Sequence, residues 1–490
     1  MESPTSVQVH ADSTALLAFL AYLIFIIAVG LASARFSSKG LNEFFLGGRK
    51  MNRFVVALSA VVSGRSAWLL IGFTGLAYAR GVSALWAAVG YIFVELLLFL
   101  YLAPVLRKET ENSDSLTIPD YFEARFKDRS GLLRLVSVVI IFIFMLAYVA
   151  AQFKAGGKAF ASGFGLSETE GLLITAGIVL LYTLLGGFLA VSITDLFQAF
   201  LMVFALLLLP LIAVHHFGGA GEVMAALRDL DPALVDPGAL SFGVLIGFLG
   251  IGLGSPGNPH ILVRYMSIRE ARQLRTSAIV GTAWNIIMAA GALLIGLVGR
   301  AIYTDSSLLP GADRENLFPH LAYAQLPPVL FGLIIAAIFA AIMSTADSQL
   351  LVASSSLVRD LYQKVLCRSR DIDNRRLVFL SRMVILGLVG LALVLGALAE
   401  EWIFWLVLFA WAGLGAALGP TLILSLFWSG ANRRGVLAGM VTGTVTVIVW
   451  KSVPALSAMI YELVPGFAFA ALMTVGVSWV TKKRDQELHS

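Results

Sequence analysis

Three hydroxyls and one carboxylate lie close together inside a long apolar stretch, residues 331–358. They are Ser344, Thr345, Asp347 and Ser348. On a helix, Ser344, Asp347 and Ser348 occupy positions i, i+3 and i+4 and share one face. A charged side chain at membrane depth is costly unless it faces the protein interior and finds a partner, so it marks an ion or substrate pathway. The cluster predicts an all-oxygen site suited to a hard cation such as sodium.

Two more charged residues lie inside apolar runs and have several interpretations. Asp195 follows Thr194 at the expected start of a span, so it either caps that helix or completes a cation site with the hydroxyl cluster. Arg65 lies too deep for its side chain to reach the membrane surface comfortably. The sequence leaves three roles open for its guanidinium: pairing with a buried carboxylate such as Asp347, binding an anionic substrate group, or standing permanently where a sodium ion would otherwise bind.

Other polar residues inside apolar runs allow plainer interpretations. Lys154 and Lys158 lie in the last third of a run, where snorkelling to the membrane surface is expected. Tyr148 and Gln152 lie deeper on the same run and are candidates to line a cavity. His260 is expected to donate a structural hydrogen bond rather than to relay protons.

The elements that position these residues are membrane spans. Of 490 residues, 59% are hydrophobic and 13% are charged, and the mean hydropathy is +0.88, so we expect an all-α polytopic membrane protein. A helix rises about 1.5 Å per residue and must cross about 30 Å of hydrocarbon. Thirteen apolar runs suffice, near 13–34, 54–79, 84–106, 132–162, 168–190, 194–216, 240–263, 276–303, 328–358, 376–398, 402–428, 434–453 and 458–480.

The net charge of +5 could suggest nucleic-acid binding, but its distribution indicates membrane topology instead. Basic residues gather in alternate loops, with clusters at 35–53, 107–134, 264–275, 359–376 and 482–484. The positive-inside rule therefore predicts a cell-membrane protein with its N-terminus outside and its C-terminus in the cytoplasm. The sequence has no nucleotide-binding loop, zinc motif or nucleophile elbow, so neither an ATP-driven pump nor an enzyme is supported.

Two spans carry helix-breaking residues at membrane depth, at 63–66 and at 252–259. Such breaks are tolerated where they are buried or line a cavity. They open two consecutive blocks of five spans, and an odd-numbered block repeats with inverted topology. This pattern is typical of a secondary transporter that binds its substrate at the midplane. We expect one transmembrane domain, 1–490, with an extra helix at 13–34, repeats at 54–216 and 240–428, and two further helices at 434–480.

Several motifs together resemble the sodium/solute symporter family, and within it the proline-transporting members. The matching segments are Glu43-Phe44-Phe45-Leu46-Gly47-Gly48-Arg49, Ile118-Pro119-Asp120-Tyr121-Phe122, the run 182–198 with Gly186-Gly187 and Thr194-Asp195, Ala340-Ala341-Ile342-Met343-Ser344-Thr345, and Phe409-Ala410-Trp411-Ala412-Gly413. The resemblance covers nearly the whole chain and implies a LeuT-type fold with thirteen helices and a 5+5 inverted-repeat core.

The resemblance also implies positions for the ions and the solute. It places one sodium site at the carbonyls of Val62, Arg65 and Ala341 and the hydroxyls of Ser344 and Thr345. A second sodium, where relatives have one, corresponds to Asp195, Ser344, Asp347 and Ser348. The substrate cavity is expected to be lined by Ser66, Ala67, Trp68, Tyr148, Gln152, Ile251, Ser255 and Pro259.

Three departures from the proline-transporting pattern limit what the resemblance implies. That pattern has an aspartate in place of Gly64, an uncharged residue in place of Arg65, and aromatic residues in place of Ile251 and Ser255. The pocket is therefore expected to be reshaped, and Arg65 could bind a carboxylate. Replacing an aspartate by a neighbouring arginine also weakens the local attraction for sodium.

These observations predict a sodium-coupled symporter that moves a small organic solute by alternating access. The solute is expected to be an amino acid such as proline or another carboxylate, and the other partners are sodium ions and the lipid bilayer. Neither nucleic acid nor an obligate protein partner is expected. Two alternatives stay open: a sodium-independent or proton-coupled carrier in which Arg65 is a gating, tethered cation, and a substrate sensor that does not transport.

Overall fold

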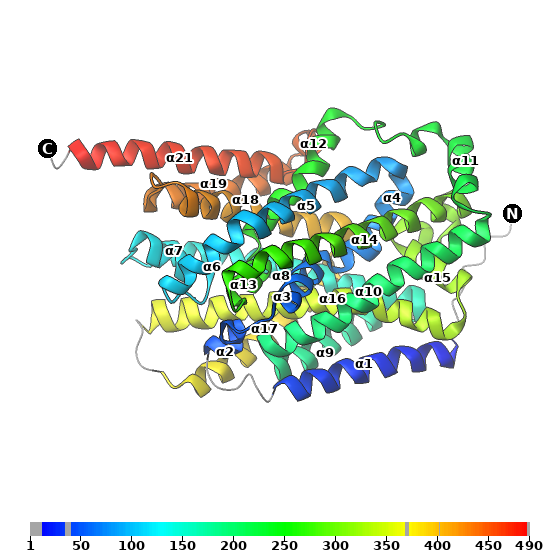
Figure 1. The fold of residues 1–490 in the computed structure, drawn as a ribbon, viewed down its shortest axis with the longest axis horizontal. Coiled ribbons are helices and arrows are strands. Elements are labelled where there is room, and N and C mark those ends of the chain that lie inside the picture. Colours follow the sequence, from blue (N-terminus) through cyan, green and yellow to red (C-terminus); the bar gives the residue numbers. More distant parts are fainter. Residues whose placement is uncertain (1–11, 35–40, 368–371, 401, 488–490) are drawn as a thin grey trace.

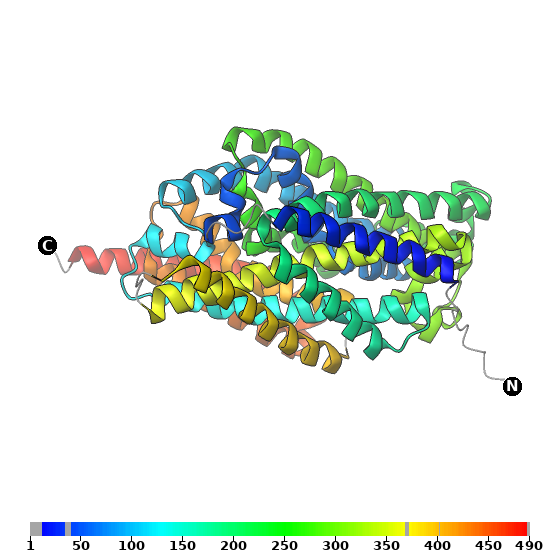
Figure 2. The ribbon, with the colours of Figure 1, turned by 90° about the horizontal axis from the view of Figure 1, so that it is seen from below.

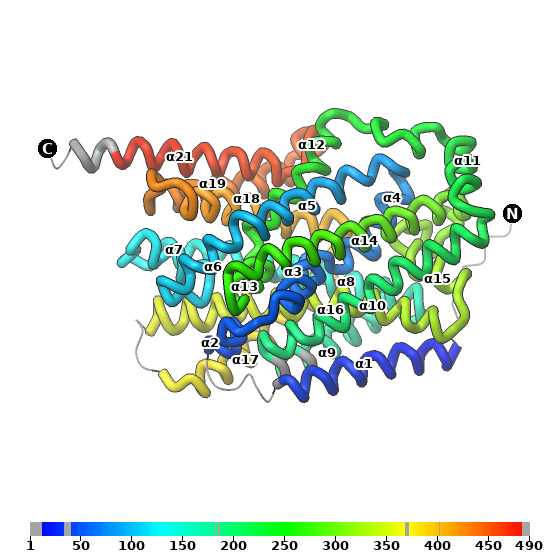
Figure 3. The backbone as a smooth tube through the Cα atoms, viewed as in Figure 1, coloured from blue at the N-terminus to red at the C-terminus, as the bar shows by residue number. Residues whose placement is uncertain are grey.

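The protein is a bundle of long helices that run side by side along one axis (Figure 1, Figure 3). The computed structural model describes residues 12–34, 41–367, 372–400 and 402–487. In those ranges the helices of more than eighteen residues are α1 (Ser13–Ala34), α8 (Leu132–Phe164), α9 (Glu168–Gly186), α10 (Phe188–Phe217), α14 (Leu274–Ile302), α16 (Pro328–Ser355), α17 (Asn374–Leu398), α18 (Ile403–Phe427), α19 (Arg433–Ser452) and α21 (Leu463–Glu487).

Shorter elements connect or interrupt these helices. They include α2 (Leu41–Leu46), α3 (Arg53–Ala67), α4 (Thr74–Arg80), α5 (Leu85–Leu97), α6 (Ala103–Asn112), α7 (Ile118–Phe126), α11 (Ala220–Leu230), α12 (Phe242–Gly250), α13 (Pro259–Ser267), α15 (Leu317–Gln325) and α20 (Pro454–Ser457), together with several short 3-10 and π segments. No strand occurs in the described ranges beyond an isolated bridge between Met51 and Ile268.

Helix α16 forms the centre of the bundle. It packs against α8, α10, α1 and α3, and 83% of its most apolar window is buried in the protein. Seen from below, α1 lies on the outside of the bundle beside α16 and α10 (Figure 2). A helix that is apolar on all faces is stable where protein or lipid covers every face. The polar cluster on α16 is therefore enclosed by other helices.

The second predicted span is interrupted at the expected place. Ser66 has a left-handed φ of 47° at the end of α3, and the chain then continues as a π segment, Trp68–Phe73, into α4. This conformation is strained for a residue other than glycine, and such strain clusters at functional sites. The Ser66 hydroxyl accepts the Trp68 backbone N–H at 3.0 Å, which satisfies one donor that the break releases.

The seventh predicted span is interrupted over a longer segment. Helix α12 ends at Gly250, a 3-10 segment covers Ile251–Gly257, and α13 starts at Pro259. The Asn258 side chain donates to the Gly254 carbonyl at 2.8 Å, and the Trp411 indole donates to the Ile251 carbonyl at 2.8 Å. Side chains thus replace backbone hydrogen bonds lost at the break, as a polypeptide in a membrane requires.

Ten helices in the described ranges are long and apolar enough to cross a membrane. One of these stretches, Arg53–Asn112, contains 60 residues and includes the predicted spans 54–79 and 84–106. The predicted span 240–263 is divided between α12, the 3-10 segment and α13. The all-helical membrane fold is confirmed, and the count of thirteen spans stays a prediction.

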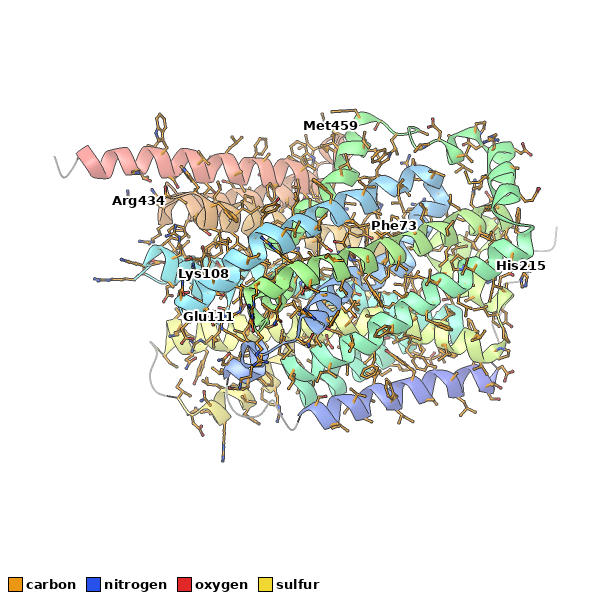
Figure 4. All side chains as sticks on the ribbon, viewed as in Figure 1. Phe73, Lys108, Glu111, His215, Arg434 and Met459 are labelled. Carbon is orange, nitrogen blue, oxygen red and sulfur yellow. The ribbon has the colours of Figure 1, made fainter. Side chains whose placement is uncertain are left out.

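The two ends of the bundle differ in the charged residues that they carry. Helix α1 begins at one end and α21 ends at the other (Figure 1). Figure 4 shows Lys108, Glu111 and Arg434 near the end where α21 finishes, and His215 near the end where α1 begins. Lys108 and Arg434, two basic residues from different helices, therefore lie toward the same end of the bundle.

Close backbone packing at the second break makes a direct test of this fold possible. A Cβ atom at Gly257 would lie 2.4 Å from the Leu414 carbonyl oxygen and 2.6 Å from the Gly415 Cα, both backbone atoms of α18. We expect Gly257→Ala to lower stability by about 1–3 kcal/mol, because backbone atoms cannot move aside cheaply. Thermal unfolding of the purified protein in detergent measures this change.

The matched control is Gly387→Ala on α17, where a Cβ meets nothing within 4 Å. Alanine favours a helix over glycine by roughly 0.5–1 kcal/mol, so this variant should melt at the same temperature as the parent or slightly higher. Equal melting temperatures for the two variants would contradict the packing described here.

Candidate functional site

The hydroxyl cluster of α16 lies against the broken end of α3. The Thr345 hydroxyl donates to the Ser63 carbonyl of α3 at 3.0 Å, and the Ser344 hydroxyl donates to the Ala341 carbonyl at 3.1 Å. Val62 and Arg65 occupy the last turns of α3, and the Arg65 carbonyl accepts the Trp68 N–H at the break. The five residues of the first predicted sodium site therefore lie on two helices that pack together.

A second set of oxygens lies one turn further along α16. Asp195 on α10 accepts hydrogen bonds from the hydroxyls of Ser59 at 2.6 Å and Ser63 at 3.4 Å. The Ser63 and Ser348 hydroxyls are 3.4 Å apart, and Ser348 donates to the Asp347 carboxylate at 3.0 Å. Asp195, Asp347 and Ser348 thus come together, as predicted, between three helices.

The capping interpretation of Asp195 is wrong. Helix α10 begins at Phe188, so Asp195 lies two turns inside the helix and its carboxylate does not cap it. The carboxylate is fully buried. Sequence analysis placed the helix start too late because the chain breaks at Gly187, which has a left-handed φ of 77°.

The side chain of Arg264, on α13, lies among this second set of oxygens. Its guanidinium lies 3.3 Å from the Asp195 carboxylate, donates to the Ser348 hydroxyl, and donates through Nε to the Ser59 hydroxyl at 3.0 Å. A further nitrogen donates to the His260 carbonyl. The side chain is 1% exposed. The prediction that Arg264 belongs to a basic loop is wrong, because it lies within α13.

A second buried arginine is neutralised by a residue that sequence analysis missed. Arg65 forms an ion pair with Glu95 on α5, and its guanidinium carbon lies 3.9 Å from the centre of the Tyr91 ring. Glu95 also accepts from Asn285 at 2.8 Å and from Ser255 at 3.3 Å. The partner of Arg65 is therefore Glu95 and not Asp347. Glu95 could have been found, because it is a charged residue inside a predicted span.

The residues predicted to contact the solute gather around the two helix breaks. Ser66, Ala67 and Trp68 lie at the α3 break, Tyr148 and Gln152 on α8, Ile251 and Ser255 in the 3-10 segment, and Pro259 at the start of α13. The Gln152 side-chain carbonyl accepts the Ala67 N–H at 3.1 Å, and the Tyr148 hydroxyl is 3.5 Å from the Ser66 hydroxyl. The Trp68 indole stacks on Phe404 with 5.5 Å between ring centres.

Two buried donors of this group have no hydrogen-bond partner among the described residues, the Trp68 indole N–H and the Gln152 amide nitrogen. Such atoms cost free energy unless a ligand or water satisfies them. A cavity beside the second set of oxygens is lined by Arg264, Ser348, Pro259, Thr117 and Ser355 among others.

Ion pairs connect different helices at each end of the bundle. At one end, Lys158 on α8 contacts Asp313 and Glu315 at 2.6 Å each, and Glu315 accepts the backbone N–H groups that begin α18. Snorkelling is therefore the wrong interpretation of Lys158. At the other end, Arg134 on α8 pairs with Asp120 at 2.7 Å and with Glu123 at 2.6 Å, and it also pairs with Asp360.

Comparison with known proteins agrees with this geometry. The family model of the sodium:solute symporter family matches residues 44–443. The high-affinity proline transporter PutP of Bacillus subtilis is 41% identical over 452 residues, which are 92% of this chain and 94% of the relative. The sodium/proline symporter of Escherichia coli is 39% identical over 472 residues, 95% of this chain and 93% of the relative.

Two solved structures share the fold. A sodium-coupled sialic acid symporter in a substrate-bound outward-open state superposes with a TM-score of 0.80 at 21% identity, covering 95% of this chain and 98% of the other. MhsT in complex with L-phenylalanine gives a TM-score of 0.57 at 14% identity, covering 88% and 98%. Both have the LeuT-type architecture, which confirms the predicted fold class. The chain belongs to the sodium:solute symporter family.

Proposed function

We propose that this protein couples the inward movement of sodium to the uptake of a small solute that carries a carboxylate, such as an amino acid. The observation that carries the proposal is the contact between the α16 hydroxyls and the broken end of α3. Thr345 donates to the Ser63 carbonyl at that break and Ser344 donates to the Ala341 carbonyl of its own helix, and neutral oxygens in this arrangement suit sodium. The proposed ligands of this site are Val62, Arg65, Ala341, Ser344 and Thr345.

The proposed solute follows from the unpartnered donors at the helix breaks. The Trp68 indole and the Gln152 amide both offer hydrogen atoms that no partner in the described part of the chain accepts, so a solute with an acceptor group is favoured. A carboxylate supplies two acceptor oxygens. Proline is the solute named for the two relatives, and it is one candidate. Ile251 and Ser255 stand where the proline-transporting pattern has aromatic residues, so larger amino acids belong in the same test.

The alternative of a sodium-independent carrier with Arg65 as tethered cation has less support. Glu95 lies against the Arg65 guanidinium and neutralises it. A neutral pair neither replaces a sodium ion nor leaves a free cation for an anionic solute. The pair instead fixes the end of α3 to α5, next to the proposed sodium and solute positions.

We also propose the orientation and repeat boundaries given by the charge and break patterns. The N-terminus lies outside and the C-terminus in the cytoplasm, with five-helix repeats at 54–216 and 240–428. Support comes from Lys108 and Arg434, basic residues of two different helices, which lie toward the end where α21 finishes (Figure 4). Cysteine labelling from either side of sealed vesicles tests the orientation.

Uptake by proteoliposomes tests the function directly. Labelled amino acids, with proline first, are offered with an inward sodium gradient, with equal sodium on both sides, or with an inward proton gradient alone. We expect accumulation with the sodium gradient. Accumulation driven equally well by protons in the absence of sodium would refute sodium coupling.

Removing a hydroxyl from the proposed sodium site should weaken sodium binding selectively. Ser344→Ala and Thr345→Ala each delete one proposed ligand, and an interaction with a charged group is worth about 1.5–3 kcal/mol. We expect the sodium concentration for half-maximal uptake to rise roughly tenfold or more. Thr183→Ala is the matched control, because that buried hydroxyl bonds to the Val179 carbonyl of its own helix. An unchanged sodium dependence in both site variants would argue against this site.

The Arg65–Glu95 pair predicts a non-additive double-mutant cycle. Arg65→Met and Glu95→Gln each leave one buried charge without its partner, which costs about 3–5 kcal/mol. The double variant leaves no unpaired charge, so it should be more stable than either single variant. Melting temperatures in detergent measure this. If the double variant loses as much as the two single losses together, the two side chains do not form the pair described.

A further inference from the structure

The second predicted sodium position contains a side chain that is itself a cation. Arg264 reaches Asp195, Ser348 and Ser59 at once. Asp195 and Ser348 belong to the set predicted to hold a second sodium ion, and Ser59 bonds to Asp195 at 2.6 Å. The guanidinium therefore uses oxygen lone pairs that a metal ion at this position would need.

We propose that Arg264 takes the place of a second sodium ion and that this symporter couples each solute to one sodium. The inference rests on the proposed function, because it concerns how many sodium ions that function uses. It names Arg264 as the residue that sets the ion stoichiometry. Sodium binds at the Val62, Arg65, Ala341, Ser344 and Thr345 site alone.

The first argument is the number of oxygens left for a metal ion. A hard cation takes about six oxygen ligands in proteins. Of the side-chain oxygens of Ser59, Asp195, Asp347 and Ser348, only Oδ1 of Asp195 and Oδ2 of Asp347 have no hydrogen-bond partner among the described residues. The Ser348 hydroxyl accepts from Arg264, and its own hydrogen is shared between the Ser344 carbonyl at 2.7 Å and the Asp347 carboxylate at 3.0 Å. The guanidinium therefore occupies the position between these oxygens, and the two carboxylate oxygens that remain do not replace the water that a sodium ion would lose.

The second argument is the charge balance of the buried centre. Around the broken end of α3, the described residues include three buried carboxylates, Glu95, Asp195 and Asp347, and two buried arginines, Arg65 and Arg264. With all three carboxylates ionised and His260 neutral, this set carries one unit of negative charge. One sodium ion makes the centre neutral, whereas two would leave a buried positive charge, which is costly at low dielectric.

The same balance gives Asp347 a role. The predicted ligands of the first sodium site are carbonyls and hydroxyls, which bring no net charge. Glu95 is neutralised by Arg65 and Asp195 by Arg264, so Asp347 supplies the remaining negative charge. It lies on α16 between Thr345 and Ser348, within one turn of the first site. Its attraction for sodium acts at short range in a low-dielectric interior.

The test is the number of sodium ions moved per solute molecule. Proteoliposomes take up labelled sodium and the transported amino acid, and the ratio is obtained from the membrane potential that stops net flux. We expect a ratio of one and a Hill coefficient near one for the parent protein. Arg264→Gln frees Asp195, Ser348 and Ser59 for a metal ion, so its ratio should rise towards two with a Hill coefficient above one.

Two variants control for loss of an arginine as such. Arg264→Lys keeps a positive charge in the position and should keep a ratio of one. Arg272→Gln removes an arginine whose side chain is 85% exposed, and its ratio should also stay at one.

Asp347→Asn, which keeps the side-chain size, should lower the sodium affinity roughly tenfold at an unchanged ratio of one.

The outcomes separate this inference from the proposed function. A ratio of two in the parent protein overturns the inference while sodium coupling stands. Transport without any sodium dependence overturns the proposed function instead. If Arg264→Gln does not fold, the sodium-to-solute ratios of the parent protein and of Asp347→Asn decide. A ratio of two in the parent that falls to one in Asp347→Asn would place a second sodium ion at Asp347 and overturn the inference. An Arg264→Gln protein that transports with a ratio of one also contradicts the inference.

Discussion

The cost of burying charge in a low-dielectric interior governs how this bundle is assembled. Each buried ion pair at its centre joins side chains from different helices: Arg65 on α3 with Glu95 on α5, and Arg264 on α13 with Asp195 on α10. An unpaired charge would cost more than a mispacked apolar side chain. These pairs therefore fix which helices are neighbours around the two breaks, while apolar packing supplies most of the contact area.

The breaks themselves depend on side chains that replace lost backbone hydrogen bonds. Ser66 and Asn258 are polar residues within the breaks, and Trp411 reaches one break from α18. Lipid offers no hydrogen bonds, so every freed carbonyl must be satisfied by protein, solute or ion. At the proposed sodium site, the ion satisfies carbonyls of α3 in the way that the N–H groups of Asn258 and Trp411 satisfy the carbonyls of Gly254 and Ile251.

Much of the architecture could be predicted from the sequence, because its signals are local. Hydropathy located the helices, and Gly-rich or Ser-rich segments located both breaks. The position of Ser344, Asp347 and Ser348 on one helical face followed from helical periodicity alone. The start of α10 was missed, since Gly187 permits a turn that hydropathy does not register.

Pairings between distant residues could not be predicted in this way. Pairing with a buried carboxylate such as Asp347 was one of three roles that the sequence left open for Arg65, and its actual partner is Glu95, 30 positions away in the sequence. Arg264 was placed in a loop, because a basic residue close to the end of an apolar run normally reaches the membrane surface. Its burial depends on the direction that α13 takes after the seven-residue 3-10 segment, Ile251–Gly257. Hydropathy carries no information about that direction.

The two clusters of ion pairs at opposite ends have a consequence for the resting state of the transporter. Lys158 and Arg134 lie on the same helix, α8, so this one helix contributes a side chain to each cluster. Alternating access must open one end while the other stays closed, and α8 transmits that constraint along its length. The relative strength of the two clusters then biases which side faces solvent when no solute is bound, and because most of these side chains are buried, salt in the surrounding solution screens the pairs only weakly.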